Sequence, residues 1–151
     1  MNSQRRKALR TAAQLVAATV FGGQVSRVFA NAEDTQAAID AFTGGTAPTQ
    51  GTVTLTAPEI AENGNTVPIS ISVDSPMTEE SYVQSVTILA EGNPNPAVAT
   101  FHFSPASGAA RASTRMRLAK TQNVIAVAKM NDGSVFTDSR NVKVTIGGCG
   151  G

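Results

Sequence analysis

Short runs in which apolar and polar residues alternate fill the chain after Pro48, and this pattern restricts the possible folds more than any other feature. In runs such as 67–73 and 83–89, Val, Ile or Leu recurs with Ser, Thr or Gln between. A period of two predicts strands that bury one face. Asn131-Asp132-Gly133 is expected to form a hairpin turn. Further strands are expected at 53–55, 97–103, 111–118, 124–130, 135–138 and 142–146.

About seven or eight short strands separated by turn-forming residues predict an all-β fold, an immunoglobulin-like antiparallel β-sandwich. A short N-terminal helix is expected before the strands, at 31–42. Asn31 or Asp34 is suited to cap this helix, and Gly44-Gly45 is suited to end it. The helix and the strands together predict one domain over 31–146.

Three places between or within the strands depart from the alternation. The segment 58–65 is expected to be a solvated acidic loop, and Asn93-Pro94-Asn95-Pro96 is expected to be a stiff loop. Pro68 has no N–H to donate, which marks its strand as an edge strand or the site of a bulge. None of the three requires a functional explanation.

The first thirty residues have the composition of an export signal. A basic head at 5–10 precedes a short apolar stretch at 15–21, which is too short and too interrupted to span a bilayer. Cleavage is expected after Ala30 or Ala32. The pair Arg5-Arg6 resembles the twin-arginine signal, although a small residue stands where that pattern prefers a large apolar one. We therefore expect a periplasmic protein without a membrane anchor, exported through the twin-arginine route.

Removal of the signal reverses the charge of the protein. Five of the twelve basic residues lie in the first thirty positions, whereas all eleven acidic residues follow them. The mature chain therefore has seven basic and eleven acidic residues, a net charge of −4 instead of +1. It keeps no basic cluster or aromatic platform of the kind that binds nucleic acid.

The single cysteine lies in the C-terminal sequence Gly147-Gly148-Cys149-Gly150-Gly151. Glycine is conformationally permissive and chain ends are poorly ordered, so residues 147–151 are expected to form a flexible arm with an exposed thiol. A reach of roughly 10 Å would let this thiol enter the cleft of a partner. With no second cysteine for an internal bridge, the alternatives are an intermolecular disulfide and an incidental thiol. Prenylation is excluded because only two residues follow the cysteine.

Catalytic and metal sites are poorly supported by the remaining residues. A nucleophilic Cys149 with the single histidine, His102, as its base would need a rigid geometry that a glycine arm cannot hold. The two side chains are too few for a zinc site, and haem attachment needs a second cysteine. Arg111, Arg115 and Arg117 share one face of a predicted strand, which indicates a solvated face or a surface that attracts an anion or an acidic partner. We predict no catalytic residue and no metal.

A family resemblance runs over the whole mature chain. It is carried by the segments 58–65, 67–68, 74–77, 90–94 and 114–119 and by the terminal Gly-Gly-Cys-Gly-Gly. On these residues the chain closely resembles the SoxY family, the sulfur-carrying subunits of the periplasmic thiosulfate-oxidising (Sox) multienzyme system.

This resemblance implies a carrier without a cofactor, whose Cys149 holds the sulfur substrate covalently. A haem-containing enzyme would join thiosulfate to Cys149, and a hydrolase would release sulfate. A sulfane dehydrogenase would then oxidise the remaining sulfur, and a second hydrolysis would restore the thiol. Family members form a heterodimer with the SoxZ subunit, which has no signal of its own. The rival interpretation is a periplasmic binding or structural module that Cys149 tethers by a disulfide.

Overall fold

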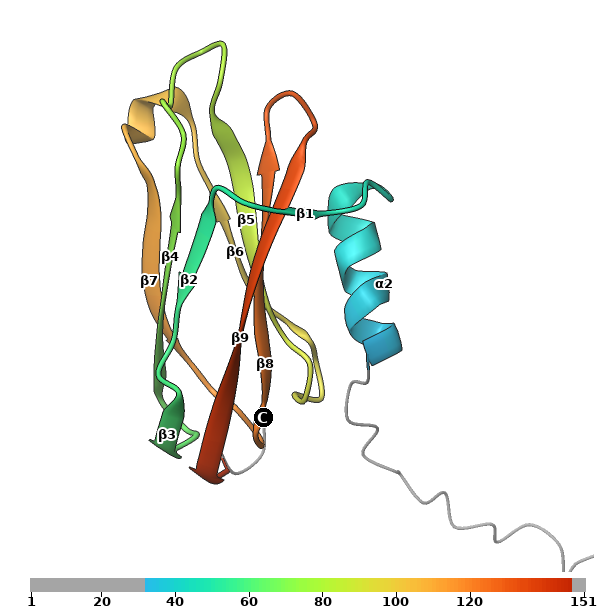
Figure 1. The fold of residues 1–151 in the computed structure, drawn as a ribbon, viewed down its shortest axis with the longest axis vertical. Coiled ribbons are helices and arrows are strands. Elements are labelled where there is room, and N and C mark those ends of the chain that lie inside the picture. The colour runs from blue at the N-terminus through green and yellow to red at the C-terminus, as the bar shows by residue number, and fades with distance from the viewer. Residues whose placement is uncertain (1–31, 148–151) are drawn as a thin grey trace, which may run out of the picture.

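Two β-sheets face each other in the computed structural model, which describes residues 32–147 (Figure 1). One α-helix, α2 (Ala32–Thr43), and one 3₁₀ helix, η1 (Pro105–Ser107), accompany the sheets. The strands of this part of the chain are β1 (Thr49–Gln50), β2 (Val53–Thr56), β3 (Ile60–Asn63), β4 (Val67–Val73), β5 (Val83–Ala90), β6 (Ala97–His102), β7 (Ala110–Met116), β8 (Gln122–Met130) and β9 (Val135–Ile146).

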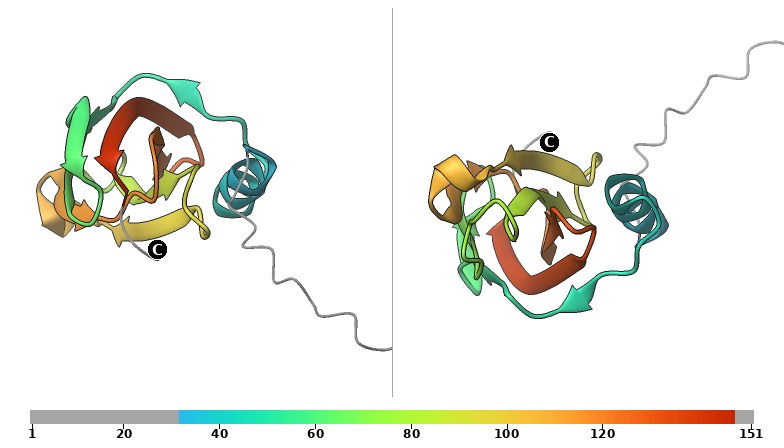
Figure 2. Two further views of the ribbon diagram at one scale, coloured as in Figure 1. Left: turned by 90° about the horizontal axis from the view of Figure 1, so that it is seen from below. Right: turned by 90° about the horizontal axis from the view of Figure 1, so that it is seen from above.

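The larger sheet has the strand order β1-β9-β8-β5-β6, with β3 paired to the same edge of β9 as β1, and the smaller sheet has the order β2-β4-β7. All pairs are antiparallel except those of β1 and β3, which run parallel to β9. Views along the sandwich show α2 beside the larger sheet, away from the smaller one (Figure 2). The predicted immunoglobulin-like sandwich with a short helix is confirmed.

The alternation of the sequence becomes the core between the sheets. In β4, Val67, Ile69, Ile71 and Val73 are buried and the residues between them are more exposed. The strand β5 is buried on both faces, because α2 covers the outer face of the larger sheet. Beneath α2, a second apolar cluster forms from Ile39, Leu89, Val127 and Val135.

Glycines with a left-handed backbone follow the helix α2 and lie in the hairpin turn between β8 and β9. Gly44 and Gly45 follow α2 with φ of +70° and +87°, and Gly45 N donates a hydrogen bond to Asp40 O at 3.0 Å. Gly133, with φ of +86°, lies in the predicted hairpin turn between β8 and β9. Glycine is favoured at such positions because it has no β-carbon. Both predicted ends are confirmed, whereas the candidate cap Asn31 lies outside the described residues.

Four local predictions need correction. The segment 58–65 is not a loop throughout, because residues 60–63 form β3 on the edge of β9. The predicted strands 135–138 and 142–146 are one continuous strand, β9, and the short β1 was not predicted. The strand of Pro68 is central, not an edge, but Pro68 lies beyond the last residue of β4 that pairs with β2, so its missing N–H breaks no pairing on that side.

Candidate functional site

The predicted site residues fall on both sides of the limit of the described chain. Gly148, Cys149, Gly150 and Gly151 lie outside the described residues, whereas Gly147 lies inside them. Among the described residues, the site is therefore the end of the sandwich where β9 terminates. We call Ile146 and Gly147 the arm base.

On one side, β3 and the residue after it hold the end of β9. Gly64 N donates a hydrogen bond to Ile146 O at 2.8 Å. The hydroxyl of Thr145 donates to Glu62 O at 2.9 Å. Because β3 pairs with β9 up to Asn63, both strands end at the same level (Figure 1). Backbone pairing thus continues to the last residue before Gly147.

On the other side, the loop that enters β8 holds β9. Val144 N donates to the Thr121 hydroxyl at 2.9 Å, and this hydroxyl lies 3.4 Å from Val144 O. Gly64 O in turn accepts a hydrogen bond from Leu118 N at 2.8 Å, and the Leu118 side chain is completely buried. We call residues 117–121 the support loop, because they contact both the turn after β3 and the end of β9.

A buried asparagine fixes the backbone of the support loop. Asn93 Oδ1 accepts a hydrogen bond from Ala119 N at 3.0 Å, and Asn93 Nδ2 donates to Arg117 O at 2.8 Å. Asn93 belongs to the loop that was predicted to be stiff and without functional significance. The sequence pattern missed its role, because its partners lie more than twenty residues away.

Gln122 completes this network. Its Nε2 donates to Asn93 Oδ1 and to Lys120 O, both at 3.0 Å, and its Oε1 accepts from Gly92 N at 2.7 Å. A β-carbon at Gly92 would lie 3.0 Å from Gln122 Cβ, which the strand holds in place, so glycine suits this close approach. Buried polar side chains that are fully hydrogen-bonded specify one conformation. The support loop is therefore a rigid element.

Gly147 packs directly against this rigid loop. A β-carbon at Gly147 would overlap the carbonyl oxygen of Ala119. The neighbour is backbone, which cannot move aside as a flexible side chain can. Any residue larger than glycine would therefore displace the arm base or the support loop, so Gly147 has a packing role that the sequence did not reveal.

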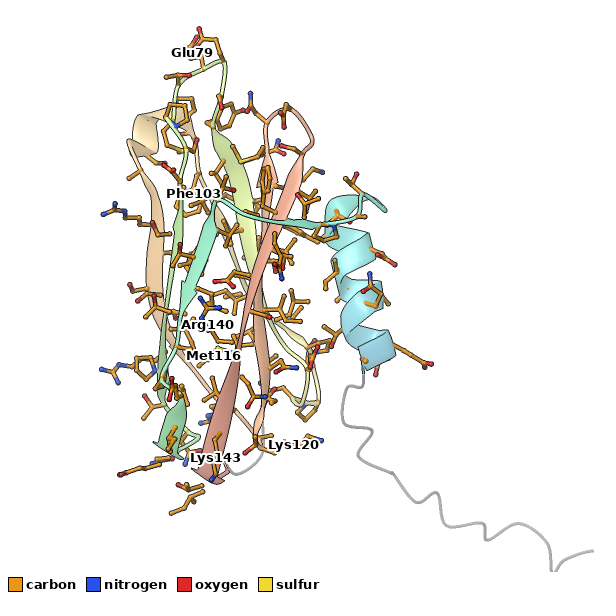
Figure 3. The ribbon with its side chains drawn as sticks, in the orientation of Figure 1. Glu79, Phe103, Met116, Lys120, Arg140 and Lys143 are labelled. Atoms are coloured by element: carbon orange, nitrogen blue, oxygen red, sulfur yellow. The ribbon has the colours of Figure 1, made fainter. Side chains whose placement is uncertain are left out.

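The surface around the arm base is partly apolar. Among residues 32–147, the large apolar side chains that remain exposed are Ile60, at 57%, and Ile146, at 68%. Both belong to the pair of strands from which the arm leaves. Lys143 is the register partner of Ile60 and is also exposed. Lys143 and Lys120 lie at this end of the sandwich, and Glu79 lies at the opposite end (Figure 3).

A hydrophilic pocket of about 360 Å³ lies between the start of α2 and the support loop. Its lining includes a chain of hydrogen bonds, in which Asn141 Nδ2 donates to Asn123 Oδ1 and Asn123 Nδ2 donates to Glu91 Oε2, both at 2.9 Å. Pockets that bind organic substrates are mostly apolar and well enclosed. This pocket does not have that character.

His102 and Arg111 lie away from the arm base, whereas Arg117 belongs to the support loop. His102 is the last residue of β6, which begins beside the Asn93 loop, so its backbone is roughly 17 Å farther along the sandwich. The structure does not bring His102 to the arm. Arg111, Arg115 and Arg117 are exposed, as is Ser113. The alternate residues Ala112, Thr114 and Met116 are more buried, which confirms that the arginines share a face.

Perturbed carboxylates occur at the end opposite the arm. Hydrogen bonds from the Ser134 hydroxyl and then its N–H lower the pKa of Asp132. Hydrogen bonds from its own backbone and from Thr78 lower the pKa of Glu80. Within residues 32–147 no three His, Cys, Asp or Glu side chains are grouped closely enough to hold a metal ion. No helix in this range is long and apolar enough to cross a membrane.

Comparison with solved structures identifies a sulfur carrier with the same fold. The SoxY sulfur carrier protein from Chlorobium limicola f thiosulfatophilum is 35% identical, with a TM-score of 0.63, over 77% of this chain and 100% of that chain. A superoxide reductase (neelaredoxin) from Ignicoccus hospitalis is 20% identical over 62% of this chain and 80% of that chain, with a TM-score of 0.55. At this identity the reductase shares the fold alone.

Comparison with protein families extends the similarity to the cysteine. Residues 39–149 match the family described as sulfur oxidation protein SoxY. A search of curated proteins finds no match. The matched segment contains the end of α2, both sheets, the support loop and the arm base, and it ends at Cys149. The chain therefore belongs to the SoxY family and is a sulfur carrier of the sulfur-oxidising (Sox) system.

Proposed function

We propose that the chain holds sulfur intermediates covalently on Cys149 during the oxidation of thiosulfate to sulfate and presents them to successive enzymes. The observation that carries this proposal is the arm base, a rigid end of the sandwich from which Gly147 leaves two residues before the cysteine. A cysteine so close to the end of the chain can be reached by several enzymes in turn.

The chemistry begins with the thiolate of Cys149. An S–S bond forms between Cys149 Sγ and the sulfane sulfur of thiosulfate, and the electron pair released passes to the haem of the conjugating enzyme. Water then attacks the terminal sulfonate in a hydrolase, which releases sulfate and leaves a persulfide on Cys149. A sulfane dehydrogenase then oxidises the outer sulfur of the persulfide to a sulfonate with oxygen from water and passes the electrons to its own electron acceptor. A second hydrolysis releases sulfate and restores the thiol.

The carrier itself supplies no catalytic residue and no cofactor in this cycle. We propose that it pairs with a SoxZ subunit as a heterodimer in the periplasm. Residues 1–30 direct export, through the twin-arginine route, and a folded partner without a signal could cross the membrane with the carrier. The three enzymes named above are its further partners.

Mass measurement tests the covalent step directly. Protein isolated from the periplasm of thiosulfate-fed cells without reductant should carry additions in sulfur-atom or thiosulfonate steps. A thiol reductant should remove them, and they should map to the C-terminal peptide. A disulfide tether would instead add a second polypeptide or a small thiol to Cys149. Unmodified thiol alone, or dimers of the chain, in cells with the complete system would contradict the proposal.

A variant tests whether the cysteine is needed for the oxidation. Cys149→Ser should abolish sulfate formation in the reconstituted system. Its free energy of unfolding should change by less than about 1 kcal/mol, because Cys149 follows the last strand, β9, in the sequence. Retained sulfate formation would contradict the carrier mechanism.

A further inference from the structure

The turn after β3 contains a dipeptide that is prone to chemical modification. Asn63 is followed by Gly64, whereas every other asparagine of the chain precedes a residue with a side chain. The backbone nitrogen after an asparagine can attack Cγ of its side-chain amide, and a side chain on the attacking residue hinders this approach. Glycine has no β-carbon and hinders it least. Asn63 is therefore the asparagine of this chain that is most open to the reaction.

The side chain of Asn63 is turned toward the peptide that follows it. Asn63 Oδ1 accepts a hydrogen bond from Asn65 N at 2.9 Å, and this bond spans the Gly64 peptide. Asn63 is exposed, so water has access to the side chain and ammonia can leave. The amide that is attacked is thus already in place, and only the nitrogen of Gly64 has to become free.

The arm base occupies that nitrogen. Gly64 N donates a hydrogen bond to Ile146 O, and Gly64 O accepts one from Leu118 N, both at 2.8 Å. Gly64 is buried between the end of β9 and the support loop. A nitrogen whose proton is hydrogen-bonded cannot attack until that bond opens, and local opening of a fold has its own free energy. The reaction therefore requires the arm base to open.

We propose that Asn63 is a site of spontaneous deamidation and that the hydrogen bonds of Gly64 at the arm base control its rate. Gly64 N loses its proton and forms a bond to Asn63 Cγ, the bond from Cγ to Nδ2 breaks, and ammonia leaves with the proton. Water then opens the succinimide ring at either carbonyl, which gives aspartate or isoaspartate. The reaction goes beyond the carrier function and does not depend on it, because Cys149 takes no part.

Isoaspartate at this position would alter the arm base. It adds a methylene group to the main chain and a negative charge to the turn. Asn63 is the register partner of Ile146, so the longer backbone moves Gly64 out of line with β9. The hydrogen bonds of Gly64 to Ile146 and Leu118 are then lost together. In an aged carrier, the reaction thus weakens the hold on the residue before Gly147.

Ageing of the purified mature chain at neutral pH tests the site. Samples are digested with pepsin at low pH, where the succinimide forms slowly, and mass spectrometry locates each exchange of an amide NH₂ for OH. Isoaspartyl methyltransferase labels the isoaspartate. Asn63 should be modified first, and Asn65, which precedes Thr66 in the same turn, is the internal control. In urea the reaction at Asn63 should be at least about tenfold faster, because Ile146 no longer holds Gly64.

Two glycine variants test the control by the arm base, at temperatures well below unfolding. Gly147→Ala is strained only while residue 147 packs against Ala119, so opening relieves the strain and deamidation should be about fivefold faster. Gly108→Ala, at the opposite end of the sandwich, should leave the rate unchanged. Hydrogen exchange of the Gly64 amide should rise by the same factor as deamidation in Gly147→Ala, because both require the release of Gly64 N.

The outcomes that would overturn the proposal are distinct. Equal rates in the folded and the unfolded chain, or the same rate in both glycine variants, would exclude control by the arm base. An intact Asn63 in the folded wild type and in Gly147→Ala, over a time in which the unfolded chain is converted, would exclude the site. Neither outcome affects the carrier function, which is tested at Cys149.

Discussion

At both ends of the sandwich the side chain of an asparagine holds the loops by hydrogen bonds. This asparagine is buried at the arm end and exposed at the opposite end. At the arm end, Asn93 and Gln122 are buried and bond to each other as well as to the backbone. At the opposite end, the exposed Asn131 accepts a hydrogen bond from Tyr82 N at 2.9 Å and donates one to Glu80 O at 3.1 Å. Buried hydrogen bonds of this kind are costly to break, so the comparison indicates that the arm end is the more rigid of the two.

The surfaces of the two ends also differ. Both ends expose carboxylates, Glu59 and Glu62 at the arm end and Glu79, Glu80 and Asp132 at the opposite end. Among the described residues, only the arm end also exposes large apolar side chains, those of Ile60 and Ile146.

Removal of the buried asparagine should have the largest effect. Asn93→Ala takes the amide away from Ala119 N–H and Arg117 C=O and removes one of the two acceptors of Gln122 Nε2, at a site that is largely buried. We expect the free energy of unfolding to fall by about 3 kcal/mol. Urea unfolding of the mature chain measures this loss.

The matched variant at the opposite end is Asn131→Ala. Its two hydrogen bonds are exposed, so water can replace them, and we expect a loss of about 1 kcal/mol. Equal losses from Asn93→Ala and Asn131→Ala would mean that the two ends do not differ in rigidity.

The same comparison explains which parts of the molecule could be predicted. Strands such as β2 and β4 follow from alternation, because burial of one face repeats every two residues. The strands β1 and β3 were missed because they add to the edge of β9 through pairing that is distant in sequence, and only Ala61 of β3 is buried. Local patterns carry no information about such pairing.

The candidate site divides in a similar way. The arm was predictable because five residues, with the single cysteine among glycines, stand together in the sequence. The network of Asn93 and Gln122 was not, because isolated polar residues in loops are usually solvated. The packing of Gly147 could not be predicted either, for a further reason. Its place among other glycines already predicts a flexible arm, so nothing in the sequence indicates that Gly147 also packs against the support loop.

Replacing one glycine at each end by alanine should lower the free energy of unfolding less than Asn93→Ala does, and for a different physical reason at each end. Gly147→Ala forces its β-carbon against Ala119, so we expect a loss of about 1–2 kcal/mol and a shift of the support loop. Gly108→Ala, after η1 at the opposite end, meets open space but has φ of +69°, so it should cost about 1 kcal/mol through backbone strain alone.

Amide NMR spectra distinguish these two causes. Gly147→Ala should shift the signal of Ala119, whose carbonyl lies against Gly147, and that of Thr121, which follows it in the support loop and bonds to Val144 of β9. Gly108→Ala should confine its shifts to η1 and its neighbours. Unchanged signals from the support loop in Gly147→Ala would show that the arm base can move away from Ala119. The reach of the arm would then not start from a fixed Gly147.

The smallest effect is expected from the exposed Asp132, and it should depend on pH. Asp132 Oδ1 accepts hydrogen bonds from Ser134 N at 2.8 Å and from the Ser134 hydroxyl at 2.6 Å, and these lower its pKa. The folded state therefore binds this proton less readily than the unfolded state, whose carboxyl has a pKa near about 3.9. The stabilisation is present above that pH and is lost as the pH falls through the lower folded pKa. In urea unfolding, Asp132→Asn should be slightly less stable than the wild type at pH 6, and the difference should shrink toward pH 3. A difference that is constant across this range would mean that the hydrogen bonds of the turn do not depend on the charge of Asp132.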